Sequence, residues 1–335
     1  MKEPFISVIV TAYNRKEYLR EALQSVADQD LPKEEFETFV VMNFEDREIE
    51  EMCHRLNAEI IHTVERNVAL FRYEAIDRAR GQVLVFLDDD DRWESRKLSH
   101  VFELFSRDRN LGFYRNSIRF INHDGVEIDN PYRYRPIQYR EKGSRLYIPG
   151  KVLEGYSEHI INRRYDFNCS SISIRKDILA LNRESARGIQ SSFDSFMFYC
   201  TVMSGYSFLV DNSVLTYYRI NGNSISFTPT LDFSARQIVT YGTMQAMAVR
   251  HGKMVLLRLI ERQIAFFELI NAIHKSDVKK KEVISLAVLF SRYLRIYKIV
   301  ENTVTEIISL VYVIHPPLGR SLYAKFTSVS SSVLP

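Results

Sequence analysis

The sequence predicts an α/β protein with a doubly wound, mainly parallel sheet and a helical C-terminal extension. Short apolar runs rich in β-branched residues alternate with segments of helical periodicity up to residue 106. This alternation is typical of parallel strands joined by right-handed helical crossovers. Beyond residue 111 short strands are separated by long, polar, tyrosine-rich connections, and from about residue 232 the periodicity is helical.

The N-terminal part opens with a β-branched run, Ile6 to Thr11, of the kind that buried parallel strands use. Asn14 is expected to cap the helix that follows, and Gly81 to end the helix before the fourth strand. The expected strands are 6–11, 36–42, 59–63 and 82–87, and the expected helices lie within 18–26 and at 48–56 and 68–80.

The later elements are shorter strands followed by long helices. They suggest a domain of residues 1–230, divided into halves at 1–106 and 107–230, then a helical region at 231–327. The tail, 328–335, is serine-rich and expected to be disordered. The expected strands are 111–122, 170–175, 207–210 and 215–219, and the expected helices are 196–204, 254–273, 282–300 and 303–314.

Charge and cysteine content limit the classes of protein to which this chain can belong. The 45 basic and 42 acidic residues nearly balance, so the net charge of +3 says little about partners. Cys53, Cys169 and Cys200 form no CxxC pair, which argues against a zinc site or a disulfide framework and fits a reducing cytoplasm. The chain enters a strand at once and has no run of 18 uncharged apolar residues, so neither a signal peptide nor a membrane-spanning helix is expected.

Four consecutive carboxylates, Asp88 to Asp91, follow the apolar run Val83 to Leu87. In open α/β sheets, ligands bind beyond the carboxyl ends of the strands. Neighbouring carboxylates raise one another's pKa unless a cation compensates, and magnesium or manganese that bridges to substrate phosphates fits best. The alternative is a helix start, where a carboxylate contributes about 0.3–1 kcal/mol, but such a start needs one or two carboxylates and not four.

Several common motifs are missing from the sequence. No GxGxxG follows the first strand, no phosphate-binding loop ends in GK[ST], and neither HExxH nor GxSxG occurs. A nucleotide-binding fold without glycine-rich loops must hold phosphates in another way, and a metal on carboxylates is the obvious one.

Three segments, in order, resemble the inverting nucleotide-sugar glycosyltransferases of family 2, which have the GT-A fold. SVIVTAYNRKEYLREALQSVADQ is similar to that family's opening strand and helix. RNVALFRYEAIDRARGQVLVFLDDDD is similar to its N-x-G-x-x-x-A-x-N motif and the metal-binding D-x-D that follows. SSFDSFMFYCTVMSGYSFLVDNSVLTYYRINGNSIS resembles the region of the catalytic base and the closing YR-x-H-x-x-S motif. Together they cover roughly the first 230 residues.

The resemblance implies a donor pocket at the ends of the first and fourth strands. Tyr13 would stack on the base unless it is a core tyrosine, and Arg15 would lie near the phosphates unless it is merely solvated. Asp90 would coordinate the metal, and Asp91 would face the donor sugar. Asp89, as the spacer, would point away. The other implied donor-site residues are Thr11, Ala12, Asn67, Arg72, Arg219 and Asp88, the last on the ribose or the metal.

The sequence departs from the family pattern at several positions. Asn43 and Asp46 follow the second strand where the family commonly has an aspartate pair. Asn43 is expected to bind the base, with Asp46 as the alternative, and the identity of the base stays open. Ala69 and Asp77 replace the glycine and the second asparagine of the middle motif. Asn221 replaces the closing histidine and is expected as a metal ligand.

Asp194 is expected to be the catalytic base. Inverting transfer needs a group that takes the proton of the acceptor hydroxyl, and Phe193-Asp194 matches the acidic pair at the start of the family's acceptor-side helix. The alternative role of Asp194 is a helix N-cap. Arg219 would stabilise charge on the leaving diphosphate, or else form an ion pair on the surface.

The function that the resemblance implies is a glycosyltransferase dependent on a divalent cation, Mn²⁺ or Mg²⁺. It would move a sugar from a nucleotide-diphosphate donor, with a UDP-sugar favoured, to a hydroxyl of a glycan, polysaccharide or lipid-linked acceptor. One rival is a nucleotidyltransferase, whose glycine-rich phosphate loop is missing here. The other is a catalytically inactive nucleotide- or carbohydrate-binding protein of the same fold.

Two further segments concern partners. Residues 132–145 interleave tyrosines with basic residues, and are interpreted as a solvated loop over the acceptor cleft or as a grip for an anionic acceptor. No nucleic-acid partner is expected. Helix 254–273 is expected to pack on its neighbours, with peripheral membrane contact or a homodimer as alternatives. The expected location is the cytoplasm, either free or at the inner face of the cell membrane.

Overall fold

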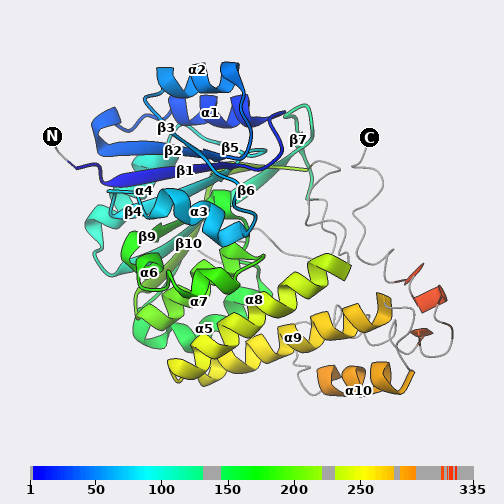
Figure 1. Ribbon diagram of the computed structural model, residues 1–335. Helices are drawn as coiled ribbons and strands as arrows, with labels where there is room; N and C mark the ends of the chain where they lie inside the picture. Colours follow the sequence, from blue (N-terminus) through cyan, green and yellow to red (C-terminus); the bar gives the residue numbers. More distant parts are fainter. Residues whose placement is uncertain are drawn as a thin grey trace.

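The computed structural model describes residues 3–130, 145–220, 231–274 and 280–291, with a few residues between 311 and 322. Within them, a mixed, mostly parallel sheet carries helices on both faces, and a further group of helices follows from the C-terminal region (Figure 1). The predicted α/β class with a helical extension is confirmed.

The N-terminal half supplies four parallel strands in the order β3-β2-β1-β4. Each lies within one residue of its predicted bounds. Thr11 pairs with Asp88 in the register of β1 and β4, so the carboxyl ends of these two strands meet at one edge of the sheet. The bounds are β1 (Ile6–Ala12), β2 (Phe36–Met42), β3 (Glu59–His62) and β4 (Val83–Asp88).

The second half continues the sheet in the order β9-β6-β10-β5. β9 lies antiparallel between β4 and β6, whereas β6 and β10 are parallel. Residues 207–219 form one strand and not the predicted two, because pairing with β6 continues through an irregularity after Val210. The bounds are β5 (Arg92–Trp93), β6 (Leu111–Ile121), β7 (Glu127–Ile128), β8 (Arg145–Ile148), β9 (Ile172–Arg175) and β10 (Ser207–Arg219).

Each face of the sheet has its own apolar core. Side chains alternate along β1, so Val8 and Val10 enter one core and Ile9 the other. The first core includes α1, α2 and α4, and the second includes α3, α5, α6 and α7. The bounds are α1 (Leu19–Ala27), α2 (Arg47–Arg55), α3 (Val68–Ile76), α4 (Lys97–Arg107), α5 (Gly150–Asn162), α6 (Lys176–Ala180) and α7 (Phe193–Ser204), with short turns η1 (Lys33–Glu35), η2 (Cys169–Ser171) and η3 (Ser185–Gly188).

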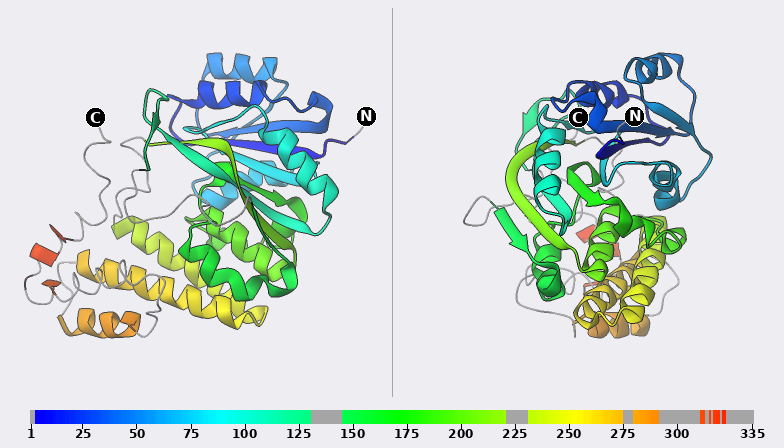
Figure 2. Two further views of the ribbon diagram at one scale, coloured as in Figure 1. Left: turned by 180° about the vertical axis from the view of Figure 1, so that it is seen from behind. Right: turned by 90° about the vertical axis from the view of Figure 1, so that its left-hand side faces the viewer.

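The C-terminal helices are α8 (Leu231–Arg250), α9 (Met254–His274) and α10 (Lys280–Ser291), and they lie on the opposite side of the sheet from α1 and α2 (Figures 1 and 2). The first two of these helices extend the second core, and α10 packs on α9 in a smaller apolar cluster around Val283. The Tyr241 ring stacks on Phe267 at 5.9 Å, which joins α8 to α9. The predicted packing of α9 on its neighbours is therefore confirmed. No helix in the described part of the chain is long and apolar enough to cross a membrane.

Three predicted helix ends are wrong. α7 begins at Phe193 and not at the predicted residue 196, so Asp194 lies inside the helix and not before it. Asn14 does not cap α1, because it adopts a φ of 55° in the turn after β1 and the helix begins only at Leu19. α3 ends at Ile76, four residues before its predicted end, so Gly81 is not its stop signal. Gly81 is needed for a close approach to β1, since a Cβ there would lie 2.5 Å from the backbone nitrogen of Ser7.

Some predicted segments lie outside the described residues. They include the loop 132–144, the closing motif with Asn221, most of the last predicted helix at 303–314, and the tail at 328–335.

Candidate active site

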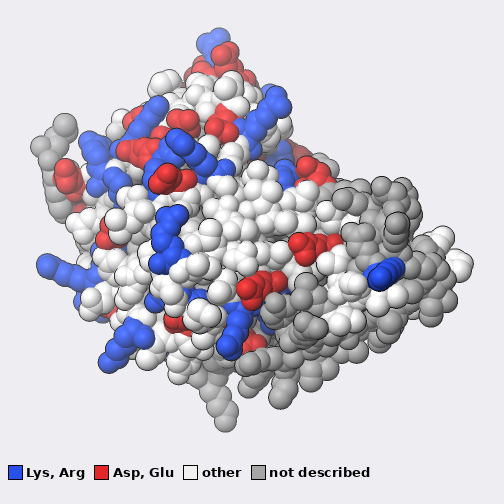
Figure 3. Space-filling model, turned by 60° about the horizontal axis from the view of Figure 1, so that its bottom comes forward, with Lys and Arg blue, Asp and Glu red and all other residues white. Residues whose placement is uncertain are grey.

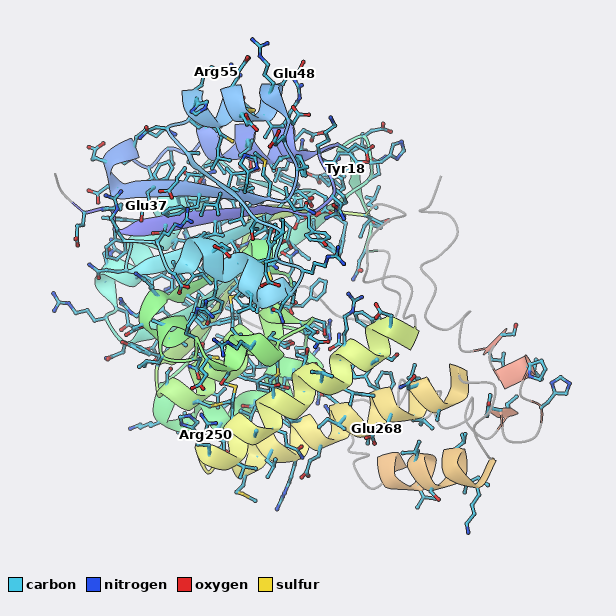
Figure 4. All side chains as sticks on the ribbon, in the orientation of Figure 1. Tyr18, Glu37, Glu48, Arg55, Arg250 and Glu268 are labelled. Carbon is cyan, nitrogen blue, oxygen red and sulfur yellow. The ribbon has the colours of Figure 1, made fainter. Side chains whose placement is uncertain are left out.

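The acidic cluster, Asp88 to Asp91, lies at the carboxyl ends of the parallel strands, between β4 and β5. In Figure 4 this end of the sheet is marked by Tyr18, at the opposite end from Glu37 on β2. Asp88 Oδ1 accepts hydrogen bonds from Thr11 Oγ1 at 3.3 Å and from Arg72 Nη2 at 2.8 Å. β1, α3 and β4 therefore converge on one carboxylate.

Arg15 forms an ion pair with two members of the cluster. Its guanidinium donates to the Asp89 carboxylate through Nε and Nη2, and Nη1 lies 2.8 Å from Asp90 Oδ2. Asp89 is therefore not a spacer that points away: it is 3% exposed and it binds Arg15. Burial, reinforced by the charge of Asp90, raises the pKa of Asp89 to about 7.

Asp91 is held on both carboxylate oxygens. Oδ1 accepts from the backbone N–H of Arg219 at 2.9 Å, and Oδ2 accepts from Asn168 Nδ2 at 3.0 Å. The residue is 1% exposed. Burial and the charges of Asp90 and Asp88 raise its pKa well above the usual range of a carboxyl.

Arg219 is fully buried behind the cluster. Its Nε donates to the Asp90 carbonyl at 2.9 Å, and Nη2 lies 2.6 Å from Glu21 Oε2. Nη1 donates to the carbonyls of residues 122 and 123, and the guanidinium lies 4.2 Å from the centre of the Tyr18 ring. The alternative of a surface ion pair is wrong, because this side chain fixes the backbone of the acidic loop from within.

Asp194 lies in the first turn of α7. Its Oδ2 accepts from the backbone N–H of Asn168 at 3.0 Å, and its Oδ1 accepts from the N–H of Ser195 at 2.9 Å. The N-cap position itself is held by Ser192, with a φ of 48°. Burial, with the charge of Asp166, raises the pKa of Asp194 above that of an ordinary aspartate.

The acidic cluster and Asp194 both lie close enough to one buried thiol to affect its pKa. Arg72, Asp88, Asp194 and Asp91 all act electrostatically on Cys169, whose pKa burial raises well above its usual value. Arg72 also lies over the ring of Phe193, 5.3 Å from its centre. The fold therefore brings together the predicted donor-side carboxylates and the predicted base, which are more than 100 positions apart in the sequence.

The remaining predicted donor residues fall into two groups. Tyr13 is 41% exposed and contacts Phe71 edge-on, with ring centres 5.6 Å apart, whereas Ala12 is fully buried. Asn43 exchanges hydrogen bonds with Asn14, at 2.8 and 2.7 Å. Two others serve as helix N-caps: the oxygens of Asn67 and Asp46 accept backbone N–H groups of α3 and α2, respectively.

Asp88 and Asp90 are the candidate metal ligands within the described residues; Asn221 lies outside them. Over the described ranges no group of three or more His, Cys, Asp or Glu side chains has the geometry of a metal site. The donor set nevertheless fits a hard cation, because carboxylate oxygens are its preferred ligands. Asp90 already binds a cation, since the guanidinium of Arg15 contacts its Oδ2.

Three contributors to the site have no signal in the sequence. Ser170 Oγ accepts from the backbone N–H of Asp88, Glu21 pairs with Arg219, and Asn168 contacts both Asp91 and Asp194. Ser170 and Asn168 lie in or beside a short turn, and the ion pair spans 198 positions, so no local pattern announces any of them.

The strand order, the carboxylate cluster at the end of β4 and the antiparallel strands of the second half are typical of a glycosyltransferase with the GT-A fold. Residues 7–170 match the model of Glycosyl transferase family 2. Residues 7–170 of the chain therefore form a glycosyltransferase domain of this family.

Curated relatives share this region. The protein described as a teichuronic acid biosynthesis glycosyltransferase, TuaG of Bacillus subtilis, is 32% identical over 134 residues, which are 38% of this chain and 52% of TuaG. The uncharacterized glycosyltransferase MJ1057 of Methanocaldococcus jannaschii is 24% identical over 228 residues, 66% of this chain and 72% of MJ1057. The match therefore spans about half the length of the first of these relatives.

Solved structures share the fold. The crystal structure of Staphylococcus aureus TarS residues 1–349 in complex with UDP-GlcNAc is similar with a TM-score of 0.61 at 17% identity, over 96% of this chain and 88% of that one. A mannosyltransferase from Pyrobaculum calidifontis in complex with GDP-Man and Mn²⁺ is similar with a TM-score of 0.50 at 14% identity, over 97% of this chain and 87% of that one.

Proposed function

We propose that this protein is a metal-dependent, inverting glycosyltransferase that moves a sugar from a nucleotide-diphosphate donor to an acceptor hydroxyl. The observation that carries this proposal is the meeting of the acidic cluster with Asp194 across Asn168. The acidic cluster would bind the donor diphosphate through a cation, and Asp194 would act as the base for the acceptor hydroxyl. Direct displacement at the anomeric carbon needs both functions in one place.

The proposed donor is a nucleotide-diphosphate sugar, with a UDP-sugar favoured. Tyr13 supports this, because its ring is partly exposed beyond β1 and is held by Phe71. Asn43 shapes the turn beneath it through its pair with Asn14, and retains one amide N–H for the base. The TarS and mannosyltransferase complexes with UDP-GlcNAc and GDP-Man are consistent with such a donor.

Asp88 and Asp90 would hold a divalent cation, Mn²⁺ or Mg²⁺, with Asn221 as a further ligand. A bound cation would offset the charge that builds on the leaving diphosphate. Arg15 is placed beside that diphosphate because it already contacts Asp90. Arg219 contributes by fixing the acidic loop, since it binds the Asp90 carbonyl and presents its own N–H to Asp91.

Asp194 is the proposed base. The acceptor hydroxyl oxygen attacks the anomeric carbon and its proton passes to a carboxylate oxygen of Asp194. The bond between that carbon and the diphosphate oxygen breaks, and the nucleoside diphosphate leaves with the electron pair. The raised pKa of Asp194 makes it a stronger base than an exposed aspartate, and its two N–H donors hold its orientation.

The proposed acceptor is a hydroxyl of a glycan, a polysaccharide or a lipid-linked sugar. Relatives described by teichuronic acid, poly(ribitol-phosphate) and amylovoran support a role in polysaccharide biosynthesis. We assign donor binding to residues 1–106, acceptor binding to 107–230 and an accessory role to the helices of 231–327.

The C-terminal helices would supply a surface that contacts the cytoplasmic face of a membrane or binds a second copy of the chain. Figure 3 shows a broad area with few charged side chains on the side that faces the viewer. The exposed apolar side chains of α9 and α10 are Met254, Val255, Ile284 and Val288.

A donor panel tests the proposed function. Purified protein is incubated with UDP-, GDP- and dTDP-sugars and Mn²⁺, and nucleotide release is measured for wild type, Asp90→Ala and Asp194→Ala. We expect one donor to be consumed and Asp194→Ala to lower kcat by about 10²–10⁴-fold, the usual contribution of a general base. Asp28→Ala, at the exposed C-cap of α1, is the control and should keep wild-type turnover.

The same panel separates the rival functions. Donor that binds without turnover under any condition would indicate the inactive binding protein. A separate incubation with a nucleoside triphosphate, a sugar phosphate and Mn²⁺ covers the other rival, since release of pyrophosphate there would indicate a nucleotidyltransferase. Full turnover in Asp194→Ala would remove this residue as the base while leaving the family assignment intact.

A further inference from the structure

Asn168 occupies an unusual place between the two halves of the site. It directly precedes η2, and it donates to two carboxylates at once: Nδ2 to Asp91 Oδ2 and the backbone N–H to Asp194 Oδ2, both at 3.0 Å. Asp91 belongs to the loop after β4, and Asp194 to the first turn of α7. A single residue thus bridges the proposed donor side and the proposed base.

We propose that Asn168 is a positioning residue that couples the acidic cluster to Asp194, so that donor binding sets the orientation of the base. The proposal rests on the function proposed above for Asp194 and for the cluster. Asn168 needs no contact with substrate for this role, because it acts through the two carboxylates.

The backbone of Asn168 supports a specific role for asparagine. Its φ is 72°, in the left-handed region, where side chains with a Cβ are strained by about 1–3 kcal/mol. Asparagine tolerates positive φ better than most residues. Glycine would accept this backbone but offers no amide, and aspartate would place a third carboxylate beside Asp91 and Asp194.

The hydrogen bonds of Asn168 also support a positioning role that is specific to asparagine. The side chain is buried, and its Oδ1 has no partner, which costs energy in a packed interior. The Nδ2 group faces Asp91 because only the amide nitrogen can donate to a carboxylate. In this orientation Oδ1 of Asn168 stays without a donor, while Nδ2 and the backbone N–H each donate to a carboxylate. Both of these hydrogen bonds are charge-assisted.

Asp194 has several other charged or titratable neighbours. Asp166 opposes its ionisation, and the N–H groups of Asn168 and Ser195 favour it. The others that act with it are Arg164 before η2, Cys169 in η2, Arg72 on α3 and Tyr241 on α8. Two of the groups that favour the ionised form also bind the acidic cluster: Arg72, which donates to Asp88 and acts on Asp194 through its charge, and Asn168, which hydrogen-bonds both Asp91 and Asp194 directly.

The test compares Asn168→Gly with Asn168→Ala. Both substitutions remove the amide that binds Asp91, but glycine keeps a backbone that tolerates positive φ, whereas alanine favours a return to negative φ and so withdraws the N–H from Asp194. The readout is the pKa of Asp194, followed by ¹³C NMR of aspartate-labelled protein and assigned with Asp194→Asn. This measurement requires no turnover.

We expect the Asp194 pKa to match wild type in Asn168→Gly and to rise in Asn168→Ala. Adding UDP and Mn²⁺ should shift the Asp194 titration in wild type and leave it unchanged in Asn168→Gly, because the link to the cluster is gone. Turnover in Asn168→Gly should fall about 10–100-fold, the usual effect of losing a group that orients a functional ligand. Thermal melts identify any variant that fails to fold.

Equal Asp194 pKa values in the glycine and alanine variants, or the same UDP-induced shift in wild type and Asn168→Gly, would overturn the proposal. Wild type that binds no nucleotide would instead count against the proposed function. In that case the glycine–alanine comparison still decides whether Asn168 controls Asp194.

Discussion

Arg15 balances part of the negative charge of the acidic cluster. Its guanidinium reaches both Asp89 and Asp90, and Asp90 is a proposed metal ligand. A cation that takes Oδ2 of Asp90 would displace one arm of Arg15. The displaced arm would then be available for the diphosphate, so we expect Arg15 both to compete with the metal and to assist the donor.

Replacing Arg15 with methionine should separate these two effects. In the absence of nucleotide, Mn²⁺ should bind Arg15→Met more tightly than wild type, because the competing guanidinium is gone. In the presence of Mn²⁺, UDP should bind more weakly, because a phosphate partner is lost. Electron paramagnetic resonance of free Mn²⁺ and calorimetry with UDP measure the two affinities.

Arg20→Met is the matched control, since Arg20 is exposed on α1 and pairs with Glu48 away from the cluster. Unchanged or weaker Mn²⁺ binding by Arg15→Met would show that the guanidinium does not compete for Asp90.

The pKa of Asp194 predicts the acid side of the activity profile. Burial raises this pKa above about 3.9, the usual value for aspartate, and the base must be ionised to accept a proton. Activity should therefore increase as the pH rises through the raised pKa. The measurement is kcat/KM against pH, and a profile that is flat from pH 4 upward would contradict the role of Asp194.

At the scale of elements, Asn67 has two candidate roles, as the N-cap of α3 and as a ligand of the donor. Its Oδ1 accepts the N–H groups of Ala69 and Leu70, both at 2.9 Å, and its Nδ2 donates to the Arg187 carbonyl at 3.1 Å. The resemblance implies a donor-site role for this residue. The structure gives both its amide oxygen and its amide nitrogen internal partners at the start of α3.

Asn67→Ala should destabilise the protein by about 1 kcal/mol through loss of the cap, whereas Asn67→Ser should retain most of the stability. Urea denaturation measures both variants. A stable alanine variant with a large loss of UDP affinity would reverse the assignment and make Asn67 a donor ligand.

The elements themselves were largely predictable, because alternating and helical periodicities survive in the sequence. Each strand from β1 to β4 matches its predicted bounds within one residue, and the acidic cluster falls at the predicted edge. The helix ends were not predictable, because they depend on contacts with residues that are distant in the sequence. A glycine is required at position 81, for example, because a side chain there would collide with the backbone of Ser7, 74 positions away.

The residues that hold the carboxylates of the site in place could not be predicted from the sequence either. Asn168 acts through a left-handed backbone and contacts 77 and 26 positions away, and Arg219 reaches Glu21 over 198 positions. The sequence identified the carboxylates because they are consecutive and follow a strand. It gave no indication of the buried groups that hold them.

At the scale of the whole molecule, the buried Lys97 should make stability depend on pH. It lies at the start of α4, donates to Asn116 Oδ1 and lies over the rings of Trp93 and Tyr114. Burial lowers its pKa to about 7, against about 10.4 in an unfolded chain. Between these values the unfolded state binds more protons, so this group makes the folded state more stable as the pH rises.

Lys97→Met removes this titration while keeping the length of the side chain. The free energy of unfolding of wild type should therefore rise relative to Lys97→Met between pH 7 and about 10, the range set by the two pKa values. Urea denaturation at several pH values measures the difference. A difference that does not change with pH would show that Lys97 is charged in the folded protein.

The central claim is that the acidic cluster binds a nucleotide diphosphate through a divalent cation. Calorimetric titration of UDP into wild type and Asp90→Asn, each with Mn²⁺ and with EDTA, tests it most directly. We predict binding only to wild type with Mn²⁺. Equal UDP affinity in EDTA, or in Asp90→Asn with Mn²⁺, would contradict the claim, as would no binding of any nucleotide diphosphate to wild type.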